Sequence, residues 1–328
     1  MKGSVSEMSL TSKLKSKKPE DIAFQKLLRA NLPKSQDFHT LSGKKSFSKE
    51  YELLIEYKLL NPYEASLLGT AFDYLIRLDI ARKTGQPFDV DKIVAVKGYS
   101  RLKNLFPKDK SLPKKFSTAQ KNMKNYQSDK SLGLLKNKEA IYADCFLCAN
   151  LDIVVRSGQP PETLTKMYTL PNKVFLEEFK ELQYLAHEKL LNLFSESDSI
   201  YYNPKFGIAS AMVGGADGDI ILNDTLIDFK TSKNSGYSWQ EAAQLVGYYL
   251  LSKIDQKLGN PRAVDFNKVA LYQARYGELV TIDLDKFYGD RLDELVNEVF
   301  VVLRKDKTYI RRFPPELYMN LMDIQELR

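Results

Sequence analysis

The sequence predicts an α/β protein, and the order of its apolar patterns is the main reason. From about Pro19 to Ser195, apolar residues recur at three- and four-residue spacing, which is typical of amphipathic helices. After Ser195 they alternate or form short runs, which indicates strands. A helical pattern over residues 238–258 separates two groups of strands. Strands on both sides of a long helix predict a mixed central sheet flanked by helices.

Individual elements follow from the same patterns. Helices are expected over residues 20–32, 63–82, 138–155, 176–194, 238–258 and 285–305. Strands are expected over residues 199–203, 205–215, 217–222, 225–230, 268–277 and 278–284. The expected organisation is a mobile basic arm (1–18), a mainly helical region (19–195) with a core helix near 63–82 and a helical insertion, and a core (196–328) that holds the sheet.

Composition favours a folded protein with an acidic partner. The chain has 328 residues, a formal net charge of +7 and two cysteines, Cys145 and Cys148. Excess Lys and Arg neutralise phosphates, so a nucleic acid is the expected partner. No second Cys or His pair completes a metal site, so both thiols are expected to be reduced and buried. No apolar run is long enough for a membrane span or a secretory signal, so a cytoplasmic location without membrane contact is expected.

A Lys-rich stretch covers residues 101–132 and interrupts the helical region. Its charges interleave with Phe106, Phe116 and Tyr126. Such a composition suits phosphate contact combined with base stacking. A solvated loop with anchoring aromatic residues explains the same pattern equally well.

A hairpin near residue 223 gathers the residues with the clearest chemistry. Asn223 and Asp224 tolerate the left-handed backbone of a two-residue turn. That turn pairs Leu222 with Thr225 and, further along, Asp219 with Asp228 and Asp217 with Lys230. Alternation then gives one apolar face and one polar face. The apolar residues are Ile220, Leu222, Ile227 and Phe229. The polar residues are Asp217, Asp219, Asp228 and Lys230.

The polar face predicts a metal site. Cross-strand acids lie about 5 Å apart at Cβ, close enough to share a divalent cation. Oxygen ligands select Mg²⁺ or Mn²⁺. A bound ion suits phosphodiester hydrolysis, and Lys230 is placed to position water or to neutralise charge on the phosphorus. A solvated, salt-bridged sheet face is the alternative for an acid two residues before a lysine.

These residues resemble the RecB-like branch of the PD-(D/E)xK nucleases, whose pattern is G-x-x-D, D-x-K-[ST] and Q-x-x-x-Y. The chain has GGAD ending at Asp217, DFKT beginning at Asp228, and QLVGY from Gln244 to Tyr248. The resemblance implies a restriction-endonuclease-like core with Asp217 and Asp228 as metal ligands and Lys230 as the catalytic lysine. It also implies that Gln244 and Tyr248 contact the site or the substrate. Packing of their helix against the sheet is an equal alternative.

The same branch often has a further ligand on an upstream helix. At that place the chain has Gly69 followed by Asp73, and it lacks the histidine common there. An ionised carboxylate among apolar residues is costly unless it is paired or bound to a metal. Asp73 is therefore expected as a ligand together with Asp219, and Glu64 is a competitor on the same helix. Arg275, on a later strand, is either a phosphate contact or an ordinary surface residue.

The expected function is hydrolysis of DNA in processing, repair or defence. RNA stays open as a substrate, because nothing in the sequence reads the 2′-hydroxyl. The alternative is a catalytically silent subunit with the nuclease fold that works through a partner such as a helicase. No G-x-x-x-x-G-K-[ST] string indicates nucleotide hydrolysis. The only histidines, His39 and His187, do not suggest a catalytic triad.

Overall fold

A computed structural model describes residues 9–58, 61–129, 138–169, 171–324 and 326–327. Its α-helices are α1 (Leu10–Lys15), α2 (Pro19–Asn31), α3 (Pro62–Thr84), α4 (Val94–Leu105), α5 (Ser111–Ser128), α6 (Lys138–Ser157), α7 (Thr165–Tyr168), α8 (Lys173–Lys189), α9 (Gly207–Met212), α10 (Trp239–Lys257), α11 (Leu284–Tyr288), α12 (Leu292–Lys305), α13 (Lys307–Ile310) and α14 (Pro315–Asp323). Its strands are β1 (His39–Thr40), β2 (Ile200–Tyr202), β3 (Ile220–Leu222), β4 (Thr225–Lys230), β5 (Lys268–Gln273) and β6 (Glu278–Asp283). Short 3-10 helices are η1 (Ser35–Asp37), η2 (Leu191–Leu193) and η3 (Gly289–Arg291).

The strands form one mixed sheet in the order β1-β6-β5-β4-β3-β2. Only β4 and β5 run parallel, and α10 connects them, as a parallel pair requires a crossover. The other neighbouring pairs are antiparallel. The α/β class with a mixed sheet is thus confirmed. The sheet also includes β1, which comes from the region expected to be mainly helical.

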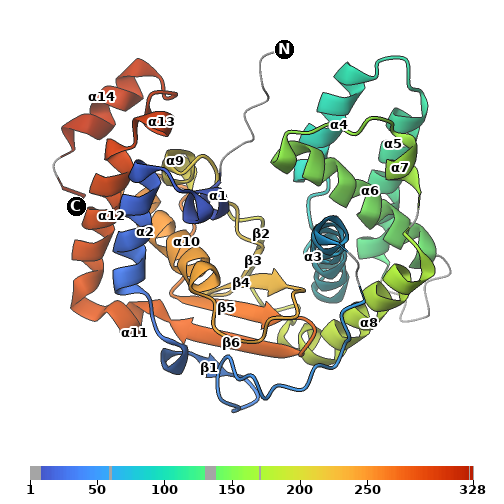
Figure 1. Cartoon of the computed structure of the whole chain (residues 1–328), viewed down its shortest axis with the longest axis horizontal. Coiled ribbons are helices and arrows are strands. Elements are labelled where there is room, and N and C mark those ends of the chain that lie inside the picture. The colour runs from blue at the N-terminus through green and yellow to red at the C-terminus, as the bar shows by residue number, and fades with distance from the viewer. Residues whose placement is uncertain (1–8, 59–60, 130–137, 170, 325, 328) are drawn as a thin grey trace.

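Helices cover both faces of the sheet. Ile227 and Phe229 of β4 pack into a core shared with α3, α6 and α8. Leu226, on the other face of the same strand, packs into a second core with α2, α10 and α12. Neighbouring residues of a strand point to opposite faces, so one strand serves both cores. Figure 1 shows α10, α2 and α12 on one side of the molecule and α3 to α8 on the other.

Two expected elements have a different structure. Residues 205–215 were expected as a strand, but Gly207–Met212 form α9. Its buried residues, Ala209 and Met212, lie three apart, which matches a helical face, and Ala and Met favour helices. The expected helix over 285–305 is divided into α11, η3 and α12, because Gly289 has a positive φ of 52° that breaks the helical path.

The prediction of a mobile arm over residues 1–18 is wrong for residues 9–18, which the structure describes. Residues 1–8 lie outside the described part of the chain. Leu10 and Leu14 are buried, and Leu10 approaches α10 so closely that a Cβ on Gly247 would lie 2.9 Å from its Cδ2. Lys13 is 1% exposed and forms ion pairs with Asp21 and Asp306. The four-residue spacing of the two leucines makes one apolar helix face, which the surrounding lysines mask in the composition.

The aromatic residues of the Lys-rich stretch face inward. Phe116 is 3% exposed and stacks on Tyr99 with ring centroids 4.6 Å apart, and Tyr126 is also buried. Phe106 packs against the same core. Of the two alternatives left open by the sequence, base stacking is therefore wrong for Phe116 and Tyr126, whereas the anchoring role is confirmed for both, on a helix and not in a loop. Residues 130–132 lie outside the described part of the chain.

Two further expectations can be compared with the structure. Cys145 and Cys148 are free and buried on α6, as expected. Within the described residues, no helix combines the length and the apolar composition needed to span a bilayer.

Candidate active site

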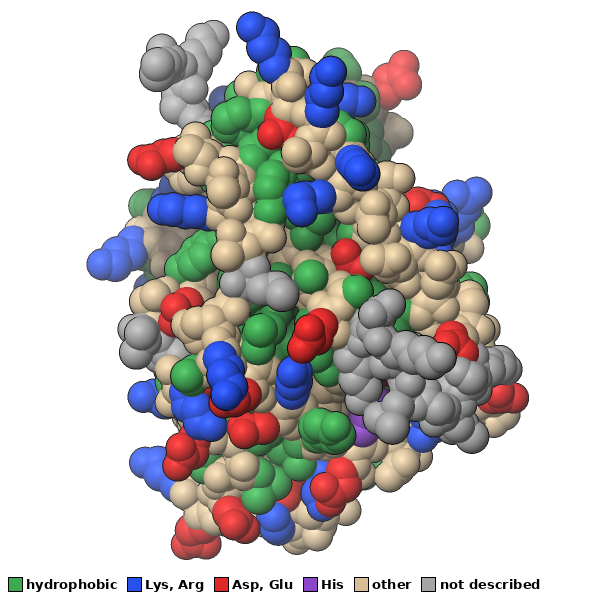
Figure 2. All heavy atoms as spheres, turned by 90° about the vertical axis from the view of Figure 1, so that its right-hand side faces the viewer, with side chains coloured by type: hydrophobic (Ala, Val, Ile, Leu, Met, Phe, Trp, Pro, Cys, Tyr) green, Lys and Arg blue, Asp and Glu red, His purple; other side chains and the backbone are tan. Residues whose placement is uncertain are grey.

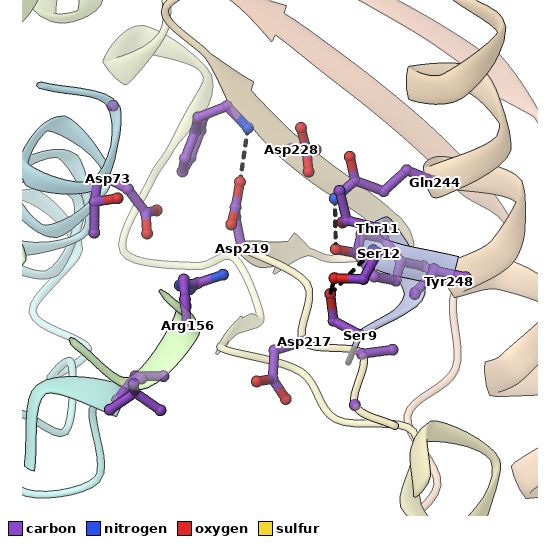
Figure 3. A pocket seen from close by; sticks show the side chains of 18 of the residues that line it. Ser9, Thr11, Ser12, Asp73, Arg156, Asp217, Asp219, Asp228, Gln244 and Tyr248 are labelled. Atoms are coloured by element: carbon purple, nitrogen blue, oxygen red, sulfur yellow. Dashed lines mark hydrogen bonds between the residues drawn. The ribbon is translucent and has the colours of Figure 1, made fainter. Parts of the chain in front are cut away.

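A pocket of about 460 Å³ opens between the two sides of the molecule (Figure 3). Residues from α1, α3, α4, α6, β4, α10 and the loop before β3 line it. Its walls therefore come from the first helix of the chain, the helical region and the sheet. The chemically distinctive lining residues are Ser9, Thr11, Ser12, Asp73, Lys97, Arg156, Asp217, Asp219, Asp228, Lys230, Gln244 and Tyr248.

All seven residues assigned to the site from the sequence line this pocket. They are Asp73, Asp217, Asp219, Asp228, Lys230, Gln244 and Tyr248. Two weaker candidates do not. Glu64 lies in the first turn of α3, outside the pocket lining. Arg275 is fully buried and ion-paired with Glu178, so neither expectation for it, a phosphate contact or a surface residue, is correct.

Asp228 lies at the centre of the pocket wall, on β4. Its side chain is 4% exposed, and its Oδ2 lies 2.6 Å from Lys230 Nζ. The two groups form a buried ion pair, and the Lys230 contact favours the ionised carboxylate. Burial raises the pKa of Asp228 to about 7, against the lowering influence of Lys230. Asp228 is thus a buried carboxyl group whose charged form depends on Lys230.

Lys230 is held from two sides. Its Nζ contacts Asp228 and donates a hydrogen bond to Gln244 Oε1 at 3.1 Å. Burial alone would lower the pKa of Lys230, but the Asp228 and Asp219 carboxylates raise it, and the net pKa lies above its usual value. The ammonium therefore stays protonated at neutral pH and points at the buried acid.

Gln244 and Tyr248 extend this chain of contacts on α10. Gln244 Nε2 donates to the Tyr248 hydroxyl at 2.8 Å, and the Tyr248 ring stacks on Phe206. The two roles expected for this pair are both present: the Tyr248 ring packs in the core, whereas Gln244 contacts the site lysine. Tyr248 fixes Gln244, and Gln244 fixes Lys230.

The hairpin forms as expected only near its turn. Leu222 pairs with Thr225 and Ile220 with Ile227, and Asn223 has the left-handed φ of 54°. Beyond Ile220 the expected pairing of Asp219 with Asp228, and of Asp217 with Lys230, is wrong. Residues 217–219 bond instead to residues 203–205 of the neighbouring segment.

The side chain of Asp219 is the reason that the pairing of β3 with β4 ends at Ile220. Its Oδ2 accepts the Phe229 backbone N–H at 2.8 Å, a donor that a continued β ladder would use. Its Oδ1 lies 3.3 Å from the Arg77 guanidinium. Figure 3 places Asp219 between Asp73 and Asp228. The second carboxylate of the pocket interior is therefore Asp219.

Asp217 lies at the edge of the pocket. Its side chain is exposed, and in Figure 3 its carboxylate turns away from Asp228. Gly214 and Gly215, with φ of 84° and 132°, shape the loop that leads to it. The expected convergence of Asp217 with Asp228 is not formed. The acid that matches the nuclease motif thus lies farther from the pocket centre than its neighbour two residues later.

Asp73 faces the pocket from α3, as expected, but with a partner that the sequence analysis missed. Arg77, one turn later, donates from Nη2 to Asp73 Oδ2 at 2.5 Å and also contacts Asp219. Asp73 Oδ1 is buried without a donor. This ion pair could have been predicted from the sequence, because Asp73 and Arg77 are four residues apart on a helix and therefore lie on the same face.

The sequence gives weak evidence, or none, that the other lining residues belong to the pocket. Arg156, at the end of α6, forms an ion pair with Asp152 four residues earlier and still reaches the pocket. Lys97 is exposed on the first turn of α4. Ser9, Thr11 and Ser12 belong to the N-terminal segment, whose contacts depend on tertiary packing and leave no motif.

The metal-free protein is expected to lose stability as the pH rises from about 4 to about 8. Burial raises the pKa of Asp73 to about 8 and that of Asp228 to about 7, above the usual 3.8. In this window the folded chain keeps protons that the unfolded chain releases, so rising pH favours unfolding. Thermal unfolding in a chelator across the window measures the slope, and Asp73→Asn should flatten it. An unchanged slope in Asp73→Asn would contradict the raised pKa assigned to Asp73.

The donor atoms of the pocket suit a hard dication. Asp73 Oδ1 is a buried carboxylate oxygen without a donor, and a divalent ion is a partner for such an oxygen. Within the described residues, however, no group of three or more His, Cys, Asp or Glu side chains is arranged to hold an ion. Arg77 contacts both Asp73 and Asp219. An ion bound by both Asp73 and Asp219 would therefore require Arg77 to move.

Comparisons of the chain with protein-family models, with curated proteins and with solved structures found no match.

Proposed function

We propose that this chain is a metal-dependent nuclease that hydrolyses DNA phosphodiester bonds, with the restriction-endonuclease-like core of the RecB-like PD-(D/E)xK enzymes. The observation that carries the proposal is the grouping of Asp228, Asp219 and Asp73 with Lys230 in one pocket, where the Asp228 carboxylate is buried and the Lys230 ammonium lies 2.6 Å from it. Carboxylate oxygens beside an ammonium group suit a hard dication together with a phosphate.

Asp228 and Asp219 would hold Mg²⁺ or Mn²⁺, with Asp73 as the third acid on the opposite wall. Asp217, at the edge, fits a water-mediated contact better than a direct one. A bound ion would polarise a phosphoryl oxygen and lower the pKa of a water molecule. No ligand other than carboxylate oxygen is needed, which favours these hard ions over zinc.

Lys230 supplies the second part of the chemistry. Its protonated amine, fixed by Gln244, is available to donate a hydrogen bond to a phosphoryl oxygen or to the attacking water. The Gln244–Tyr248 contact limits the rotation of the amine, so little reorganisation is needed when charge develops on the phosphate.

A catalytically silent DNA-binding or scaffolding subunit is the second candidate, favoured by one observation. Arg77 already pairs with Asp73 and Asp219, so part of the acidic charge is neutralised without a metal ion. Calorimetric titration with Mn²⁺ separates the candidates, because a silent subunit of this kind should take up no ion at Asp228.

Cleavage assays test the enzymatic proposal. Wild-type protein with Mg²⁺ or Mn²⁺ is expected to hydrolyse DNA, and Asp228→Asn to lose about 10²–10³-fold or more of that rate. Asp224→Asn is the matched control, because Asp224 lies on the turn of the same hairpin, half exposed and paired with Lys268. Equal loss in both variants, or cleavage that persists in a chelator, would contradict the proposal.

A further inference from the structure

The strongest concentration of positive charge in the chain lies on α4, α5 and the loop between them. Residues 94–128 include nine Lys or Arg and a single acid, Asp109, for a net charge of +8. The whole chain has a net charge of +7, so all other residues together sum to −1. In Figure 2, basic side chains outnumber acidic ones over the upper part of the face that α4 and α5 occupy.

Most of these cations have no acidic partner. Lys124 pairs with Asp91. Seven exposed lysines of this segment have no ion pair with any described residue, and we refer to five of them as the basic surface: Lys97, Lys103, Lys108, Lys110 and Lys114. Unpaired ammonium groups on one structural unit create a positive potential that is not cancelled locally. An extended polyanion is the partner that such a surface fits.

The basic surface begins at the pocket. Lys97 lines it, at the start of α4. The position of α4 is fixed by Gly98, because a Cβ there would lie 2.0 Å from the Leu151 carbonyl oxygen on α6. α4 has 12 residues and extends about 18 Å from the pocket towards Lys103 and the loop. The basic surface therefore starts at the pocket with Lys97 and continues on α4, the loop after it and the first turn of α5.

The surface presents cations and no free aromatic platform. Proteins that hold single strands combine a basic groove with exposed rings on which bases stack. Among the described residues 94–128, Phe116 and Tyr126 are buried, and Tyr99 and Phe106 are partly buried and pack against the core. Tyr99 stacks on Phe116, and the Lys103 amine lies 5.9 Å from the centroid of the Tyr99 ring. A duplex is held through its phosphates without access to base faces. The chemistry of this surface therefore favours a double-stranded backbone.

We propose that the basic surface docks the duplex next to the cleaved bond, through phosphate contacts that do not read sequence. The site of cleavage rests on the function proposed above, but the docking contacts do not depend on catalysis. Both are therefore testable separately in the same full-length chain.

The test measures binding without cleavage. We would record the fluorescence anisotropy of a short labelled DNA duplex and of one of its single strands. A chelator is present, and every protein carries Asp228→Asn, the parent variant, so that the DNA is bound but not cleaved. The test variant adds Lys103→Gln, Lys108→Gln and Lys110→Gln, which leave every pocket residue in place. The control adds Lys26→Gln, Lys286→Gln and Lys305→Gln, exposed lysines on α2, α11 and α12. Both triple variants change the net charge equally.

The test variant is expected to bind the duplex roughly tenfold or more weakly at low salt, and the slope of log affinity against log salt between about 50 and 200 mM should fall by about 3. The control should keep the parent slope. Unchanged duplex binding in the test variant, or a larger loss for the single strand, would overturn the proposal. If the wild-type chain never cleaves DNA but the duplex loss is seen, docking stands and the nuclease function fails.

Discussion

Replacing Lys230 with methionine is expected to lower the rate of DNA cleavage by about 10²–10³-fold while Mn²⁺ binding persists. The Lys230 ammonium lies 2.6 Å from Asp228 Oδ2 and donates a hydrogen bond to a neutral acceptor, Gln244 Oε1. Methionine keeps the length and apolar volume of the side chain and removes the charge and the donors. Loss of rate without loss of metal is the pattern expected for a group that acts on the phosphate or the water.

The control for this prediction lies three residues later. Lys233 is exposed, and its amine lies 5.6 Å from the centroid of the Tyr57 ring, in a different pocket. Lys233→Met should cleave DNA at nearly the wild-type rate. Circular dichroism and calorimetric Mn²⁺ titration establish that Lys230→Met is folded and loaded. A Lys230→Met enzyme as active as the control would refute the catalytic role.

Replacing Lys13 with methionine is expected to reduce the free energy of unfolding by about 3–5 kcal/mol. The Lys13 ammonium is buried and neutralises Asp21 of α2 and Asp306 after α12. Burial raises the pKa of Asp306, but contacts led by the Lys13 hydrogen bond lower it below its usual value. Without Lys13 both carboxylates stay buried with no counter-charge, which costs more than the loss of a surface ion pair.

Chemical denaturation of three variants checks this prediction. Lys15→Met, on the exposed side of the same helix, should change stability by less than about 0.5 kcal/mol. Adding Asp21→Asn and Asp306→Asn to Lys13→Met should restore part of the loss, because the buried charges are then absent. A loss in Lys13→Met no larger than that of Lys15→Met would show that α1 is not anchored by this cluster.

Local patterns predicted much of the fold. The alternation over residues 220–229 follows from burial on both faces of a strand, and the turn at Asn223 follows from its tolerance of positive φ. Gln244 and Tyr248 share a helix face because they are four residues apart, and the contact between them forms. These features depend on residues close in sequence, so the sequence was sufficient to predict them.

The errors arise where a distant segment competes for the same bonds. Asp217 and Asp219 separate from β4 because residues 203–205 bond to that segment and the Asp219 side chain takes the Phe229 N–H. Arg275 is buried because Glu178, nearly a hundred residues earlier, neutralises it. Lys13 is buried for the same kind of reason, through Asp306. Each partner is set by tertiary packing, which spacing along the chain does not reveal.

The central claim is that Asp228 and Asp219 hold a hard divalent cation beside Lys230. Crystals of the full chain soaked in Mn²⁺, with data collected to measure the anomalous signal of manganese, test it most directly. We predict a peak coordinated by Asp228 and Asp219, with Asp73 near it and Asp217 farther away. No peak in an intact pocket, or a peak bound through Asp217 without Asp228, would contradict the claim.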